Sequence, residues 1–401
     1  MKRIFLAAGE ASGDLHAAIL VRALRARRGD LEFWGVGGER MEAEGVRLIL
    51  RSEELAVVGL AEVLERLPRI FEALTQVAGA LGELRPDLFV PVDSPDFNFR
   101  LLPRAFRLGI PTVYYISPQL WAWRPGRVRA LRRFVRRVVA IFPFEEEFYR
   151  AHRVPVTWVG HPLADLLLPA ALPRAERARL GLAATTGPAV ALLPGSRHSE
   201  VRRIAPLLRS TAEAVDRARA AADEAPVTWI AGLAPGLTPV ELNLPGVRHW
   251  LPGTDALRAA DFGIVASGTV TLEALLLERP VIVTYRLNPL TFALARHAVR
   301  VEHIAMANLV AGHRVVPELV QADAIPETLA GAALAWLRDP GARAAAVDGL
   351  REARARLGPP GAADRAAGAI LGEMEAARWT GWRREPGVDV NRANDAPKGI
   401  R

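Results

Sequence analysis

The sequence contains no cysteine in its 401 residues. A disulfide framework, a thiolate nucleophile and a thiolate zinc site are therefore excluded, whereas metal sites built from histidine and carboxylate side chains remain open. The chain also lacks an apolar run of about 18 residues, the length that a membrane-spanning helix needs. Its first residues lead directly into a predicted strand and not into a signal peptide with a small-residue cleavage site. We therefore expect a cytoplasmic protein.

Lysine is almost absent, since only Lys2 and Lys398 occur. The formal net charge of +8 and the pI near 10.6 therefore come from arginine. Such a charge suits nucleic acid or an anionic membrane surface. However, alanine, arginine, proline and leucine are abundant along the whole chain, and no nucleic-acid-binding module or clustered basic helix is evident. We expect no nucleic acid partner.

Apolar residues make up 50% of the chain, enough for two or three domains with their own cores. Strand-like runs alternate with helical segments in both halves, which is typical of parallel sheets covered by helices. In the first half the runs are 3–8, 32–35, 87–92, 111–116, 137–142 and 156–160. In the second half they are 189–193, 227–231, 247–250, 262–266 and 280–285. The sequence thus predicts an α/β protein with two Rossmann-like domains.

The predicted division of the chain follows from prolines after the last strand of the first half. We expect domains at 1–168 and 169–345, then helices at 346–380 that could pack back on the first domain. The segment 381–401 is polar and aperiodic, which predicts a disordered tail.

Ligands of such sheets bind beyond the carboxyl ends of the strands, so the loops at these positions are the candidate sites. In the first half one loop, 9–14, is a glycine-bracketed turn that contains Glu10 and Ser12. Another contains Asp93 and Asp96, and Asp93 lies closest to the strand end, where a general base would be wanted. An Asx-type turn around the intervening proline is the alternative. The loop 117–124 carries two tryptophans, which suit stacking on a sugar, covering an acyl chain or plugging the core.

Between these loops, residues 55–84 carry apolar side chains over more than one helical stripe. Pro68 marks a break or the start of a new helix. Two interpretations remain open: a helix buried on several sides, or an apolar surface with basic spots for lipid. The candidate membrane or acyl contacts are Val63, Leu64, Arg66, Leu67, Arg69, Ile70 and Phe71.

Two turns in the second half are candidate phosphate sites, because free N–H groups at the start of a helix attract anions. The first contains Ser196 and Arg197, and an arginine fork can bond two diphosphate oxygens. The second is Ser267, Gly268 and Thr269 after a buried strand. Glu273 lies one turn further along, where it could accept hydrogen bonds from ribose hydroxyls. An ordinary helix cap with a solvated glutamate is the alternative.

Nine segments together closely resemble the lipid-A-disaccharide synthase family, in that family's order. They are AGEASGDLH (8–16), EELAVVGLAEVL (53–64), DSPDFN (93–98), YYISPQLWAWRPGRV (114–128), FPFEEEFY (142–149), GHPLAD (160–165), LLPGSRHSEV (192–201), ASGTVTLE (266–273) and NLVAG (308–312). The resemblance covers roughly residues 3–315 and implies the GT-B architecture, in which two Rossmann-like domains face a cleft.

The resemblance implies an inverting, metal-independent transfer that needs no cofactor. UDP-2,3-diacylglucosamine and 2,3-diacylglucosamine 1-phosphate would give a β-1,6 disaccharide and UDP at the inner face of the membrane. It assigns the catalytic base to Asp93 and the donor diphosphate to Arg197. It places Glu10 and Ser12 in the cleft, and Glu273 and Asn308 on the nucleotide side.

The sequence departs from the family pattern where Met306 and Ala307 replace Leu-Pro, and the tail has no counterpart, so oligomeric state is not predicted. A UDP-sugar epimerase of related architecture and a non-catalytic nucleotide or lipid binder are the competing functions.

Overall fold

The first half of the chain forms a seven-stranded parallel sheet in the computed structural model, which describes residues 1–55, 60–122, 125–182, 187–287 and 302–379. The strand order is β3-β2-β1-β4-β5-β6-β7. Their bounds are β1 Lys2–Ala8, β2 Leu31–Gly37, β3 Arg47–Arg51, β4 Leu88–Val92, β5 Val113–Tyr115, β6 Arg137–Ala140 and β7 Val156–Trp158. The order reverses between β1 and β4, so the loops after these two strands flank the crevice where such sheets bind ligands.

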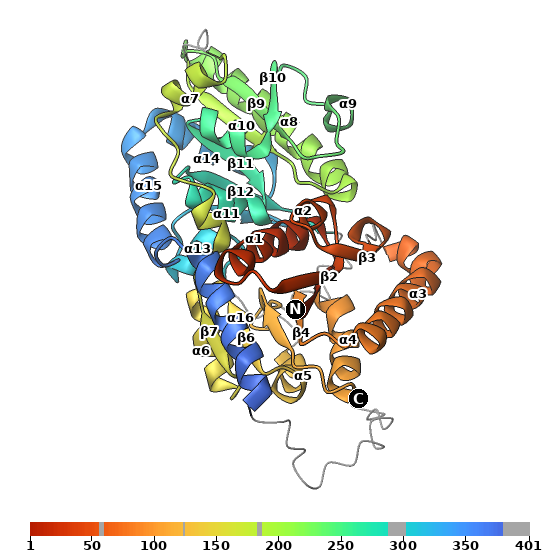
Figure 1. Cartoon of the computed structure of the whole chain (residues 1–401). Coiled ribbons are helices and arrows are strands. Elements are labelled where there is room, and N and C mark those ends of the chain that lie inside the picture. The colour runs from red at the N-terminus through yellow and green to blue at the C-terminus, as the bar shows by residue number, and fades with distance from the viewer. Residues whose placement is uncertain (56–59, 123–124, 183–186, 288–301, 380–401) are drawn as a thin grey trace, which may run out of the picture.

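The second half forms a six-stranded parallel sheet with the order β10-β9-β8-β11-β12-β13. The bounds are β8 Ala189–Leu193, β9 Thr228–Leu233, β10 His249–Pro252, β11 Phe262–Ala266, β12 Val281–Tyr285 and β13 Glu318–Val320. Here the order reverses between β8 and β11. The GT-B prediction of two Rossmann-like sheets is confirmed (Figure 1).

Two strands were missed in the sequence, and both lie at the edge of a sheet. β3 has only three apolar residues between two arginines, and β13 has only three residues. An edge strand is covered less fully than a central one, so its sequence lacks the continuous apolar run that marks buried parallel strands.

Helices cover both faces of each sheet, and alternate residues of a strand point to opposite faces. Ile4 and Leu6 of β1 belong to one apolar cluster, whereas Phe5 and Ala7 belong to another. In the first half the helices are α1 Ala11–Arg27, α2 Glu39–Ala43, α3 Leu60–Leu84, α4 Pro95–Arg107, α5 Val128–Phe134 and α6 Pro143–Ala151. In the second half they are α7 Pro173–Arg179, α8 His198–Ala221, α9 Pro239–Leu242, α10 Gly253–Ala259, α11 Thr269–Leu276, α13 Met306–Ala311, α14 Pro326–Arg338, α15 Pro340–Ala355 and α16 Ala362–Trp379.

The predicted break at Pro68 is wrong, because α3 continues through this residue. A proline inside a helix costs a hydrogen bond, so the packing of α3 must outweigh that local preference. Val77 and Leu81, further along α3, are fully buried in the core of the first half.

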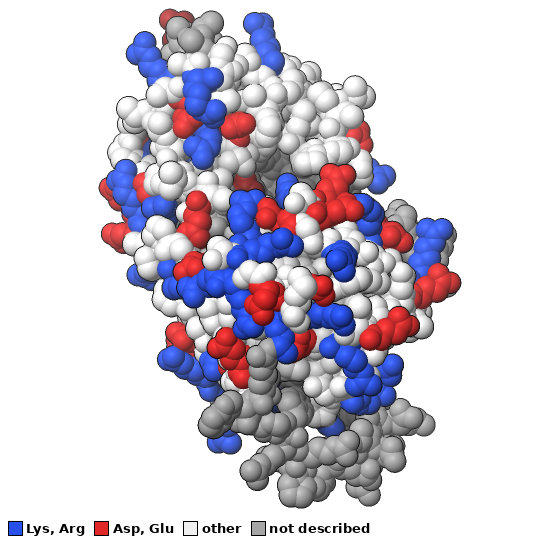
Figure 2. All heavy atoms as spheres, viewed as in Figure 1, with Lys and Arg blue, Asp and Glu red and all other residues white. Residues whose placement is uncertain are grey.

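The last helix, α16, returns to the first sheet and lies against α1, β5 and β6 (Figure 1). Arg27 on α1 makes two hydrogen bonds of 2.6 and 2.7 Å to Asp364, and Arg137 on β6 donates to Glu373 at 2.6 Å. Figure 2 shows acidic and basic side chains interspersed over this face of the molecule. Arg27 and Arg137 are thus each paired with a carboxylate of α16.

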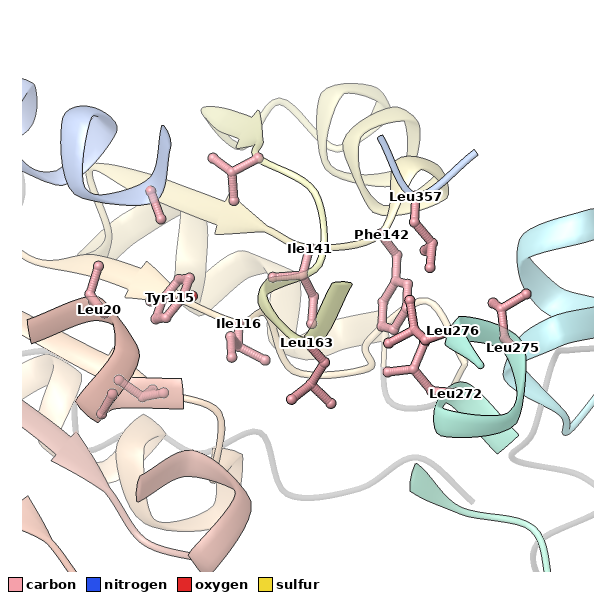
Figure 3. Packing of buried hydrophobic residues seen from close by; sticks show 14 of the residues in the cluster. Leu20, Tyr115, Ile116, Ile141, Phe142, Leu163, Leu272, Leu275, Leu276 and Leu357 are labelled. Atoms are coloured by element: carbon pink, nitrogen blue, oxygen red, sulfur yellow. The ribbon is translucent and has the colours of Figure 1, made fainter. Parts of the chain in front are cut away.

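One apolar cluster joins the two halves of the molecule. It contains Ile116, Phe142 and Leu163 of the first half together with Leu272 and Leu276 of α11 (Figure 3). A core shared in this way fixes α11 against the loops that end β5 and β6.

Candidate active site

The loops at the two points where strand order reverses carry the predicted site residues. Glu10 follows β1 and Asp93 follows β4, while Arg197 follows β8 and Ser267 follows β11. Because each pair of strands is hydrogen-bonded and parallel, each pair of loops lies side by side.

Asp93 is held by its main chain in an unusual conformation. Both Asp93 and Ser94 are left-handed, with φ of +47° and +44°, although neither is glycine. The N–H of Asp93 donates to Tyr115 O at 3.1 Å, and the carbonyl of Asp93 accepts from Tyr114 Oη at 2.6 Å and Asn98 Nδ2 at 2.8 Å. Such strain persists only where the surroundings hold it, and it concentrates at functional sites.

The electrostatic surroundings of Asp93 suit a general base. Burial, and next the negative charge of Glu10, raise the pKa of Asp93 to about 6, although a backbone hydrogen bond from Ser94 opposes the rise. A carboxylate with this pKa is ionised at pH 7 and holds a proton more readily than an ordinary aspartate.

The β1 loop contributes one exposed carboxylate and one contact to the β4 loop. Glu10 and Ser12 are both exposed, and the N–H of Gly9 donates to Ser94 Oγ at 3.1 Å. Asp14 in the same loop is structural, because its carboxylate accepts from the N–H of Gly38 at 2.7 Å and thereby caps α2.

Asp96 pairs with a residue outside this arrangement. It is exposed at the start of α4, and its Oδ1 forms an ion pair with Arg127 Nη2 at 2.9 Å. His16 of α1 is buried and packs edge-on against His161, with 5.7 Å between ring centroids. Burial lowers the pKa of His16 to about 4, so it is neutral at pH 7.

The loop after β5 is anchored by Glu145, which sequence reasoning missed. Glu145 accepts from Trp121 Nε1 at 3.3 Å and from the N–H of Ile141 and Phe142, each at 3.0 Å. Burial raises its pKa to about 7. Trp121 is only half-buried and meets the ring of Phe144 edge-on, whereas Trp123 lies outside the described residues.

The start of α11 is open. Gly268 and Thr269 are exposed, and a Cβ added to Gly268 would meet no atom within 4 Å. No described residue accepts a hydrogen bond from the N–H of Gly268, Thr269 or Val270. Ser267 is held from both sides, since its N–H donates to Thr284 O at 3.0 Å and its hydroxyl to Ile304 O at 3.2 Å.

The start of α8 carries an internal carboxylate. Glu200 Oε2 accepts from the N–H of Ser196 at 3.3 Å and of Arg197 at 3.4 Å. Its Oε1 lies 3.6 Å from Arg197 Nη1, and the Arg197 side chain is 65% exposed. Arg197 is the N-cap position of α8, and Glu200 bonds back to it.

Glu273 lies at the inner side of α11 and meets a residue that the sequence did not single out. Thr254, the second residue of α10, donates to Glu273 Oε2 at 2.9 Å. Burial raises the pKa of Glu273, against the opposing effect of this hydrogen bond. One carboxylate oxygen therefore has a protein partner already.

Asn308 is fully buried, and both polar atoms of its side chain have partners within the chain. Its Oδ1 accepts from the N–H of Val315 at 2.7 Å and Val316 at 2.9 Å, and its Nδ2 donates to Glu318 Oε1 at 2.8 Å. Glu318 in turn accepts from the N–H of Ala305 at 3.0 Å, at the start of α13. These contacts make Asn308 an organiser of the loop between α13 and β13, so any part that it plays at the nucleotide is indirect.

Only part of the predicted membrane contact can be placed. The side chains of Val63, Leu64, Arg66 and Leu67 lie outside the described part of the structure. Arg69 is exposed, Ile70 is half-buried, and Phe71 is 57% exposed with the guanidinium of Arg100 5.7 Å from its ring centroid. The helix thus has an apolar exposed position near its middle and core positions further on.

The described residues include neither a metal-binding cluster nor a membrane-spanning helix. They contain no group of three histidine, aspartate or glutamate side chains placed to hold a metal ion. None of their helices combines the length and apolar character needed to cross a bilayer.

Comparisons with known proteins agree on one family. A family model described as lipid-A-disaccharide synthetase matches residues 4–359. The lipid-A-disaccharide synthase of Myxococcus xanthus is 44% identical over 378 residues, which is 92% of this chain and 97% of that protein. The enzyme of the same name from Alkalilimnicola ehrlichii is 47% identical over 347 residues, 84% of this chain and 90% of that one.

Solved structures share the fold at much lower identity. A calicheamicin glycosyltransferase has a TM-score of 0.59 at 17% identity, covering 93% of this chain and 98% of its own. The UDP-GlcNAc 2-epimerase of Neisseria meningitidis bound to UDP-GlcNAc has a TM-score of 0.56 at 11% identity, covering 94% and 99%. Transferases and epimerases alike have this architecture, so the fold alone does not choose between them.

Proposed function

We propose, from the premise that this chain belongs to the lipid-A-disaccharide synthase family, that it joins two acylated glucosamines into the lipid A disaccharide. The donor is UDP-2,3-diacylglucosamine and the acceptor is 2,3-diacylglucosamine 1-phosphate. The acceptor's 6-hydroxyl attacks C1 of the donor sugar, the bond from C1 to the diphosphate breaks, and UDP leaves with inversion at C1.

The observation that carries this proposal is the chemistry of the loops at the two points where strand order reverses. The loops of the first sheet contain a proton acceptor, and those of the second sheet contain an open anion site. Residues 1–168 then form the acceptor domain and 169–345 the UDP-sugar domain, with Asp93 and Arg197 on opposite sides of the reaction. Asp93 takes the proton of the acceptor hydroxyl as that oxygen bonds to C1. Its pKa of about 6 leaves it ionised before the reaction.

The departing diphosphate is bound by groups of the second domain. The open N–H groups of Gly268 and Thr269 stand at the positive end of α11, and the exposed guanidinium of Arg197 supplies a full positive charge. Ser196 contributes to the loop that presents Arg197. Electrostatic stabilisation of this kind acts on the charge that develops as UDP leaves.

Glu273 binds the ribose hydroxyls in this proposal. Its carboxylate is held by Thr254 at one oxygen, which leaves accepting capacity for a ligand. Asn308 supports the nucleotide side from within, and Glu10 and Ser12 line the acceptor side of the cleft.

The acyl chains of both substrates bring the enzyme to the cytoplasmic face of the membrane. Phe71, Ile70 and Arg69 on α3 form the described part of this contact. The adjoining helices α4 and α5 present Arg107, Arg129, Arg132 and Arg133, which are all exposed and which suit anionic headgroups. A bilayer surface attracts each such charge by about 1 kcal/mol.

An epimerase remains the alternative of a different class. The epimerase likeness is confined to the fold, at 11% identity, whereas the relatives at 44% and 47% identity are synthases. An epimerase would consume UDP-sugar without an acceptor, and a non-catalytic binder would hold UDP without releasing a product.

One incubation separates these functions. Purified protein is mixed with both acylated sugars, and UDP and the disaccharide are measured together over time. Equal amounts of UDP and disaccharide, formed only when both substrates are present, support the transferase. A UDP-sugar isomer formed without acceptor supports the epimerase, and binding of UDP without either product supports the non-catalytic protein.

A further inference from the structure

The two candidate phosphate sites of the second domain differ in what already occupies them. At the start of α8 the carboxylate of Glu200 accepts hydrogen bonds from the N–H groups of Ser196 and Arg197. At the start of α11 the N–H of Ser267 donates to Thr284 O, but the N–H groups of Gly268, Thr269 and Val270 have no acceptor among the described residues. A phosphate can therefore approach α11 directly, whereas α8 already holds a negative charge of its own.

Glu200 also reaches across the sheet toward α11. Tyr285 ends β12, which lies on the far side of β11 from β8, and its hydroxyl donates to Glu200 Oε1 at 3.4 Å. A contact between the loop after β8 and the end of β12 must pass over the end of β11, where α11 begins. Glu200 is therefore next to the open anion site, and its side chain is only 15% exposed.

We propose that Glu200 is a positioning residue for the donor diphosphate, which fills the start of α8 and holds the guanidinium of Arg197 beside the open start of α11. This inference rests on the proposed function. It divides the binding of the diphosphate between the N–H groups of α11 and the side chain of Arg197, and it leaves the N–H groups of Ser196 and Arg197 to Glu200.

The physical reason lies in the freedom of an arginine side chain. Arg197 is 65% exposed, and an exposed arginine loses considerable rotamer entropy when a ligand orders it. An ion pair with Glu200 at 3.6 Å restricts those rotamers before UDP arrives. Tyr285 fixes the carboxylate in turn, so the three side chains form one chain of contacts from β12 to Arg197.

The opposite role for Glu200 makes a different prediction. If the carboxylate merely stands in for a phosphate and is displaced by UDP, then removing its charge frees the start of α8 and strengthens UDP binding. Positioning and displacement therefore change the affinity for UDP in opposite directions.

Glu200→Gln is the variant that separates the two roles, because glutamine at the third helical position still supports a capping box. Tyr285→Phe removes the hydroxyl that holds Glu200. The matched control is Glu224→Gln, which removes the same charge beyond the other end of α8, a helix of 24 residues and about 36 Å. Glu224 pairs with Arg338 at 2.8 Å.

The measurements are calorimetric titration of UDP, the donor KM and kcat, and the melting temperature of each variant. We expect Glu200→Gln to raise the UDP Kd and the donor KM roughly three- to tenfold, with kcat changed less. Tyr285→Phe should give a smaller change in the same direction, and Glu224→Gln should bind UDP like the wild type. In an Arg197→Ala background, Glu200→Gln should cause no further loss, because its effect passes through that arginine.

Tighter or unchanged UDP binding by Glu200→Gln overturns the inference. An equal loss of UDP affinity in Glu224→Gln overturns it too, as does a loss in the double variant equal to the sum of the losses in Glu200→Gln and Arg197→Ala. The wild-type protein is titrated and assayed in the same series. If the wild type makes the disaccharide but the variants do not bind UDP as expected, the role of Glu200 is rejected and the proposed function stands. If the wild type binds UDP but makes no disaccharide, the proposed function is rejected. The UDP titrations of the variants then still test whether Glu200 positions Arg197.

Discussion

The reversals of strand order in the two sheets have the same topology and opposite chemistry. In the first sheet the crevice between β1 and β4 contains two carboxylates, Asp93 and Glu10, and burial followed by the charge of Glu10 raises the pKa of Asp93 to about 6. In the second sheet the crevice between β8 and β11 contains open N–H groups and the exposed Arg197. A topological crevice therefore fixes where a site lies, and the side chains that follow the strands decide whether it takes a proton or holds an anion.

Backbone conformation differs between the two crevices as well. Asp93 and Ser94 are both left-handed without being glycine, whereas the turn before α11 contains Gly268 at its exposed position. In the first crevice a strained backbone thus holds the side chain of Asp93. The second leaves room for a ligand to meet the backbone.

The largest effect is expected from Asp93→Asn, which tests the proton acceptor. An amide keeps the shape but cannot accept the proton, so we expect kcat to fall by about 10²–10⁴-fold. The pH profile of kcat/KM in the wild type should rise through about pH 6, and this limb should vanish in the variant. Retention of more than about a tenth of wild-type kcat would assign the base elsewhere, with Asp96 or Glu10 next.

Stability provides a control on the same variant. The folded pKa of Asp93 is raised from 3.8, so the stability linked to its protonation is present below pH 3.8 and is lost as the pH rises through about 6. At pH 8 the ionised carboxylate costs on the order of 3 kcal/mol, and Asp93→Asn should therefore unfold at a higher temperature than the wild type. A lower melting temperature would show that its loss of activity reflects misfolding.

Arg197→Ala is expected to have the next largest effect, this time on both binding and turnover. Loss of the fork should weaken UDP binding and lower kcat by about 10²-fold. Arg197→Lys should restore little, because an ammonium cannot bond two oxygens in the same geometry. Titration of UDP into all three proteins checks this, and equal affinities would place the diphosphate on the start of α11 alone.

Glu10→Gln should shift the pH profile without abolishing turnover. Its charge raises the pKa of Asp93, so its removal lowers that pKa and moves the acid limb of kcat/KM to lower pH. Glu375→Gln on α16, which removes a charge from an exposed carboxylate far along the chain, is the control and should leave the limb in place. A limb that stays fixed in Glu10→Gln, or moves to higher pH, would separate Glu10 from Asp93.

The smallest effect is expected at the membrane contact, where two positions on α3 are compared. Phe71→Ser should weaken binding to anionic vesicles several-fold, with little change in unfolding free energy, because Phe71 is 57% exposed. Leu81→Ala should lose about 2–5 kcal/mol of stability, since Leu81 is fully buried. Unaltered vesicle binding with a marked loss of stability in Phe71→Ser would make this part of α3 core and not surface.

The sequence alone was enough to predict the central strands and the loops that follow them. Their apolar runs are continuous because helices cover both faces of each sheet. Such a run can be recognised from the sequence alone. β3 and β13 were missed because these edge strands are short, and charged residues border the three apolar residues of β3. Pro68 was misjudged because the packing of α3 outweighs the local preference of proline.

The partners of the site residues could not be predicted, because they come from distant parts of the chain. Glu145 holds Trp121, Thr254 holds Glu273, and Tyr285 reaches Glu200 only because β12 lies next to β11. A glycine turn before a helix likewise does not reveal whether its N–H groups are free. The N–H groups of Gly268 and Thr269 are open at α11, whereas before α8 the carboxylate of Glu200 accepts from the N–H groups of Ser196 and Arg197.

The most direct test of the division between the two crevices is titration of UDP into Asp93→Asn and Arg197→Ala side by side at pH 7.5, with turnover measured on the same samples. The account predicts that Asp93→Asn binds UDP like the wild type although it scarcely turns over, and that Arg197→Ala binds UDP at least about tenfold more weakly. Loss of UDP affinity in Asp93→Asn together with wild-type affinity in Arg197→Ala would contradict it.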